Sequence, residues 1–174
     1  MNAIISIEAA LPHELFDAAR DAVTAWRGRC LDLFSRSETA VTETLLALAA
    51  LDGRPETIRL PHLVGQRYDA LAVAIGPEGP FEKDGKAAFE ALARFRQHDL
   101  LRTNVAHGVF TVTLDRHGRW HLVSRVLVLR SGCESRSVFV AEQDEAAEIL
   151  RTLEKNSSRL RSTLGQLRKA DPGV

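Results

Sequence analysis

Apolar residues recur every three or four positions over the first third of the chain, a spacing typical of a helix with one buried face. The members of this stripe are Leu15, Ala19, Ala22, Trp26, Cys30, Leu33, Val41, Leu45 and Leu48. The pattern predicts helix over about 12–52. It leaves open whether one helix runs throughout or a second one starts near Ser35 or Ser37. Asp52-Gly53 is a stop signal.

Two shorter helices are predicted next. One covers 62–75, where Leu63, Tyr68, Leu71 and Ile75 share a face. After a loop rich in Gly and Pro at 76–85, a further helix is predicted over 85–107. Gly108 is well placed to end it, because glycine is common just after a helix C-terminus.

From 109 the apolar period changes to two, which predicts strands. The stretch "DRHG" at 115–118 is typical of a hairpin turn in which Gly118 supplies a positive φ. A third strand is expected in "SRSVFVA", before a last helix over 142–169. We therefore expect a single domain, 1–174, of mainly α, α+β class. It is a helical bundle with an antiparallel β-hairpin or three-stranded sheet at about 109–140.

Composition narrows the function classes. Lys+Arg and Asp+Glu both number 23, so nucleic-acid binding must be argued from a local site and not from net charge. Cys30 and Cys133 form no Cys-x-x-Cys pair, and no Cys/His group has zinc spacing, so no metal or cofactor is expected. The first residues do not read as a signal peptide, and the longest apolar run is too short to span a bilayer. These features predict a cytoplasmic protein that does not enter membranes.

The candidate chemistry lies in "RTNVAH", at 102–107. Arg102 carries a planar donor fork suited to phosphate, His107 can exchange a proton near neutral pH, and Asn104 can orient either. On an unbroken helix Arg102 and His107 are about 140° apart, and Asn104 and His107 about 60° apart. For Arg102 and His107 to converge, the helix must distort or a second chain must take part.

A structural interpretation competes with the chemical one. His107 would cap the helix C-terminus, and Arg102 would pair with Asp99. Glu38 bears on the same question, because it stands on an otherwise apolar stripe and needs a partner if it is buried. Arg102 is the obvious candidate for that partner.

The stretch "LRTNVAHG" resembles the signature of the HEPN superfamily, small α-helical proteins of prokaryotic defence and toxin–antitoxin systems. The segments "LFSRSETAVTETLLAL", "LPHLVGQRYDAL" and "AFEALARFRQHDLLRTNVAHG" resemble the helices of that family. The resemblance implies a homodimer that cleaves RNA without metal. His107 would be general acid or base, Arg102 would stabilise the phosphoryl charge, and Asn104 would position the substrate. Glu38 and Asp99 would support them. An antitoxin or another protein partner is also implied.

The strand pattern directly behind the motif departs from the family's simplest form. Two alternatives therefore stay open. One is a non-catalytic HEPN-like module that dimerises or binds a partner or nucleotide. The other is an unrelated α+β interaction protein. Among the other histidines, we expect solvated side chains at His98, His117 and His121. Trp26 and Trp120 are expected to be core or interface anchors.

Overall fold

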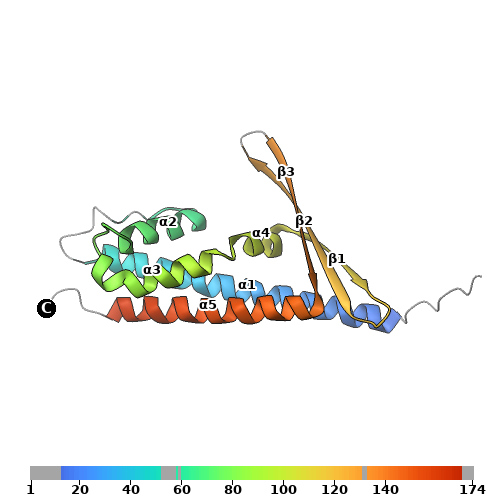
Figure 1. Ribbon diagram of the computed structural model, residues 1–174. Coiled ribbons are helices and arrows are strands. Elements are labelled where there is room, and N and C mark those ends of the chain that lie inside the picture. Colours follow the sequence, from blue (N-terminus) through green and yellow to red (C-terminus); the bar gives the residue numbers. More distant parts are fainter. Residues whose placement is uncertain (1–12, 52–57, 59, 131–132, 170–174) are drawn as a thin grey trace, which may run out of the picture.

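The described part of the chain, residues 13–51, 58, 60–130 and 133–169, folds into five helices and one three-stranded antiparallel sheet in a computed structural model (Figure 1). This confirms the mainly α, α+β class with a sheet before the C-terminal helix. The elements are α1 (His13–Ala49), α2 (Val64–Ile75), α3 (Glu82–Arg96), α4 (Asp99–His107), β1 (Val109–Leu114), β2 (Trp120–Arg130), β3 (Cys133–Glu142) and α5 (Gln143–Lys169).

The long helices α1 and α5 lie side by side and run in the same direction (Figure 1). The Trp26 indole Nε1 donates to the Ala146 carbonyl at 2.8 Å, and the hydroxyls of Ser37 and Ser157 lie 2.9 Å apart. In both pairs the partners are 120 residues apart, so the two helices keep one register along their contact. Serine is small, so the helices can approach closely at Ser37 and Ser157, where each hydroxyl is the hydrogen-bond partner of the other.

The buried stripe of α1 differs in phase from the predicted one at its start. Leu15 and Ala22 are exposed, whereas Val23 and Phe34 are buried with Trp26. The helix is a single element to Ala49, with no second start at Ser35 or Ser37. No helix in the described ranges is long and apolar enough to cross a membrane.

The predicted helix over 85–107 is wrong in one respect, because it is two helices. At Gln97 and His98 the backbone N–H groups bond three residues back, to Arg94 and Phe95. Bonds of this kind tighten a helix end. The chain then restarts as α4 in a new direction, which carries the "RTNVAH" segment across α1 to the sheet (Figure 1).

The sheet has the order β1-β2-β3, and Gly118 in the first turn has φ 76°, as predicted. One face packs on the helices through Trp120, Leu122, Ser124 and Val126, all of which are buried. β1 pairs with β2 only as far as Arg125, whereas β3 follows β2 to Arg130. The ends of β2 and β3 therefore continue as a two-stranded arm away from the helices (Figure 1).

Candidate functional site

Arg102 on α4 pairs with Glu38 on α1. The Arg102 Nε lies 2.6 Å from the Glu38 Oε1, and the two side chains are 31% and 22% exposed. Among the described residues, nothing accepts a hydrogen bond from the two Nη groups of Arg102. Glu38 thus orients the guanidinium through its Nε and leaves both Nη groups available to another acceptor.

The expected alternative pair, Arg102 with Asp99, is wrong. Asp99 lies 3.5 Å from Arg96, one turn earlier, and Arg96 also contacts Asp69 at 2.7 Å. Asp99 therefore belongs to a separate ion-pair group at the start of α4, where its backbone carbonyl also accepts from the Thr103 hydroxyl at 3.1 Å. Of the two supporting acids, only Glu38 pairs with Arg102.

Asn104 is fully buried and lies between α4 and the sheet. Its amide Nδ2 donates to the Leu100 carbonyl at 2.9 Å, and the Ser124 hydroxyl donates to its Oδ1 at 3.3 Å. Because both ends of the amide are used inside the protein, Asn104 positions α4 on β2. The geometry gives it no direct access to a substrate.

His107 is the last residue of α4, and its exposed side chain hydrogen-bonds to no described residue. The cap that was expected from His107 comes from elsewhere. The Arg27 Nε on α1 donates to the Val105 carbonyl at 2.7 Å, and its guanidinium carbon lies 4.6 Å from the Phe110 ring centre. His107 is therefore free of a structural task at the helix end.

Arg27 was missed at the sequence level. It stands 78 residues before Val105, and nothing in its local pattern separates it from the other arginines of α1. It supplies a cation to the carbonyl end of α4, where positive charge is favourable.

A single chain does not bring Arg102 and His107 together. The helix is unbroken from Asp99 to His107, so the two residues stay on different faces, about 140° apart. A site that uses both must draw one of them from another chain, or must bind a substrate that wraps around the end of α4.

His98 is not the solvated histidine that was expected. It is half-buried, its Nε2 lies 3.0 Å from the Asn156 amide, and its ring packs edge-on to Phe95. Burial lowers its pKa, against the opposing effect of the Asp99 charge. Its contacts tie the break between α3 and α4 to α5, which is a structural task.

Tyr68 on α2 is 3% exposed, and its hydroxyl has no hydrogen-bond partner among the described residues. Burial raises its pKa, and the Glu38 charge adds to that effect. Tyr68 therefore stays neutral beside the Glu38–Arg102 pair and contributes apolar packing beneath it.

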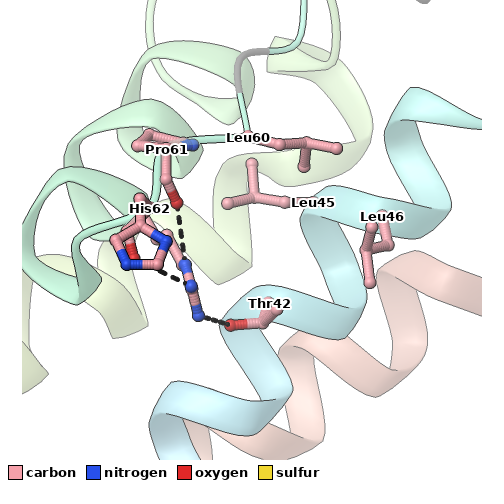
Figure 2. A pocket seen from close by; sticks show the side chains of 7 residues that line it. Thr42, Leu45, Leu46, Leu60, Pro61 and His62 are labelled. Carbon is pink, nitrogen blue, oxygen red and sulfur yellow. Dashed lines mark hydrogen bonds between the residues drawn. The ribbon is translucent and has the colours of Figure 1, made fainter.

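Two surface hollows lie around α1 and α2. One of about 270 Å³ lies between α1 and residues 60–62 (Figure 2). Its cation, Arg67, already donates to the carbonyls of Pro61 and His62 and to the Thr42 hydroxyl. It therefore holds this segment against α1.

A second hollow borders Glu38 and is lined by Ser35, Glu38, Thr39, Thr42, Glu43, Val64 and Arg67. Two carboxylates make it unsuited to phosphate. Across the described ranges, no group of three His, Cys, Asp or Glu residues is placed to hold a metal ion.

The remaining sequence candidates lie elsewhere. His117 is exposed in the β1–β2 turn, whose Gly118 approaches Leu15 at the start of α1. His121 is partly buried and lies 3.9 Å from Asp115, so it is not freely solvated. Trp26 and Trp120 are buried core residues, as predicted.

Comparisons with protein-family models, with curated proteins and with solved structures find no match for this chain.

Proposed function

We propose that this chain is a metal-independent endoribonuclease of the toxin or defence type that acts as a homodimer. The reaction is attack of a ribose 2′-oxygen on the adjacent phosphorus. The bond to the 5′-oxygen of the next nucleotide breaks, and a 2′,3′-cyclic phosphate forms. One histidine accepts the 2′-hydroxyl proton or delivers a proton to the leaving 5′-oxygen.

The observation that supports the proposal most directly is the hydrogen bonding of the Arg102 guanidinium. Its Nε is held by Glu38, while both Nη groups point to no protein acceptor among the described residues. A guanidinium held in this way is preorganised for the charge that develops on phosphoryl oxygens. The exposed imidazole of His107, five residues on, is the matching proton carrier.

The homodimer is part of the proposal because one helix presents Arg102 and His107 on different faces. In a pair of chains, Arg102 of one and His107 of the other act on the same phosphate. Asn104 acts from inside the protein by holding α4 on β2. An antitoxin or other protein partner would act by covering this surface.

The test is cleavage of a mixed single-stranded RNA in the presence of EDTA by the wild type, His107→Ala and Arg102→Ala. Loss of either group is expected to reduce the rate by roughly 10²–10⁴-fold. His117→Ala is the matched control, because His117 is an exposed histidine of the distant β1–β2 turn. Cleavage that persists in both motif variants, or its absence in the wild type, contradicts the proposal.

A second candidate is a non-catalytic HEPN-like module for dimerisation or partner binding. Two observations favour it, namely the complete burial of Asn104 and the ion pair of Arg102. It predicts that Arg102→Ala lowers stability or assembly while RNA stays intact with every variant.

A further inference from the structure

The strand β3 forms an open edge of the sheet. It pairs with β2 at every position from Cys133 to Glu142, and no described strand lies on its other side. Its register has no bulge, and its sequence "CESRSVFVAE" contains neither Pro nor Lys. Bulges, Pro and Lys are among the devices by which proteins block an edge strand. Among the described residues, no strand covers the outward backbone groups of β3, although the Glu142 N–H donates to the Glu145 carboxylate at 3.4 Å.

The outer face of β3 carries a short symmetric pattern of side chains. Val138 and Val140 are 62% and 54% exposed, although both are apolar. Arg136 precedes them and Glu142 follows them, and both charged side chains are exposed. The order along this face is therefore cation, apolar, apolar, anion.

We propose that β3 pairs with β3 of a second copy of this chain, antiparallel, about a two-fold axis at Phe139. Residues directly opposite in an antiparallel pair share a face. With Phe139 opposite itself, Val138 faces Val140 of the second copy, and Arg136 faces Glu142. The symmetry repeats both contacts, so every outward side chain from 136 to 142 meets a complementary one.

The neighbouring registers lack this complementarity. An axis at Val138 puts Arg136 opposite Val140, and it sets Glu134 opposite Glu142, a repulsive pair. An axis at Val140 puts Val138 opposite Glu142. The register at Phe139 is therefore the one that charge and apolar pattern select together.

Face-to-face packing of two sheets explains the exposed valines less well. Arg125 lies in the middle of the outer face, flanked in register by Val109 on β1 and Val138 on β3. Stacking two such faces would bury the Arg125 side chains of both copies, which is costly unless each charge is paired. Edge pairing leaves Arg125 in solvent.

This interface goes beyond the proposed ribonuclease and does not depend on it. His107 adjoins β1, which is the opposite edge of the sheet from β3. Pairing through β3 therefore keeps the two His107 residues apart, and it is a separate contact from the one that joins two motifs. A chain with both contacts assembles beyond a dimer.

The test is sedimentation equilibrium of the full chain with a charge swap. Arg136→Glu and Glu142→Arg each place like charges across the interface, and the double variant restores opposite charges. Each single swap is expected to raise the dissociation constant of the β3 contact by about tenfold or more, and the double variant to recover most of it.

Arg151→Glu is the control, because Arg151 is an exposed arginine that pairs with Glu148 within its own chain, as Arg136 pairs with Glu134. Circular dichroism checks that every variant keeps its fold. Three outcomes would overturn the β3 contact. They are a wild type that stays monomeric up to about 0.1 mM, single swaps that leave the dissociation constant unchanged, and a double variant that self-associates no better than the single swaps. The two proposals can fail independently. If the wild type self-associates through β3 but leaves RNA intact, the ribonuclease proposal fails and the β3 contact stands.

Discussion

The Glu38–Arg102 pair is a partly buried ion pair that joins α1 to α4. Glu38→Ala leaves the guanidinium of Arg102 partly buried without its partner. We expect the free energy of unfolding to fall by about 1–2 kcal/mol, because the pair is hydrogen-bonded and less than a third exposed. Urea denaturation measures this.

The control for that change is Asp32→Ala. Asp32 and Arg36 form a pair on the surface of α1, with side chains 56% and 60% exposed. Its loss is expected to cost no more than about 0.5 kcal/mol. Equal losses in the two variants would contradict a special role for Glu38.

His98 makes the stability of the fold depend on pH. Its pKa is lowered in the folded chain, chiefly by burial. The unfolded chain therefore binds more protons as pH falls through the unfolded value of 6.5, and the free energy of unfolding decreases below it. His98→Gln keeps a hydrogen-bonding group but does not titrate.

The measurement is denaturation of the wild type and His98→Gln at pH 7.5 and pH 5.5. The advantage of the wild type over the variant is expected to shrink at the lower pH. NMR titration of the His98 ring gives the same quantity directly, and a pKa above 6.5 would contradict the burial argument.

At the scale of elements, the junction of α4 with the sheet depends on Gly108. Its φ of −74° suits any residue, so the requirement is space. A Cβ there would lie 2.0 Å from the Ser124 hydroxyl and 2.4 Å from the Asn104 carbonyl. The same two residues hold α4 on β2, so a bulkier residue at 108 must push the helix off the strand.

Gly108→Ala is therefore expected to destabilise the chain by about 1–3 kcal/mol, as overpacking does. Gly28→Ala is the opposite control. Gly28 is an exposed residue within α1 with nothing within 4 Å of its added Cβ, so the same substitution stabilises by roughly 0.5–1 kcal/mol. Thermal unfolding separates the two, and a stable Gly108→Ala would refute the close approach.

The order of elements was predictable because burial periodicity is a local property of the chain. Helix and strand types followed from periods of three to four and of two, and the turn at Gly118 from its residues. The break at Gln97–His98 was not predictable, because it is held by Asn156 of α5, 58 residues away.

At the scale of the whole molecule, the arm formed by β2 and β3 is peripheral to the core. Leu127 is 61% exposed, and residues 134–136 are exposed as well. Val126 and Ser137 are direct partners in the register, so an Asn-Gly turn can join them in place of 127–136.

This shortened chain is expected to keep its unfolding temperature within about 4 °C, because the deleted part adds little to the helical core. Its self-association is expected to weaken, because Arg136 is removed from the proposed β3 contact. Calorimetry and sedimentation measure the two effects. A fall of more than about 10 °C would show that the arm supports the bundle.

Periodicity and residue chemistry alone predicted the helix and strand types, their order and the residue types of the candidate site, but not the division of 85–107 into α3 and α4. The sequence also singled out Glu38 as a partner for Arg102, because a charge on an apolar stripe needs one. These inferences concern neighbours along the chain or the chemistry of a single side chain.

The surroundings of each candidate residue, in contrast, are set by the packing of elements that lie far apart in the chain. This packing buried Asn104 against Ser124, gave the cap of α4 to Arg27, and left His107 exposed. The contacts of Asn104 and Arg27 join residues 20 and 78 positions apart. No local pattern specifies them, because packing of whole elements chooses which polar group meets which.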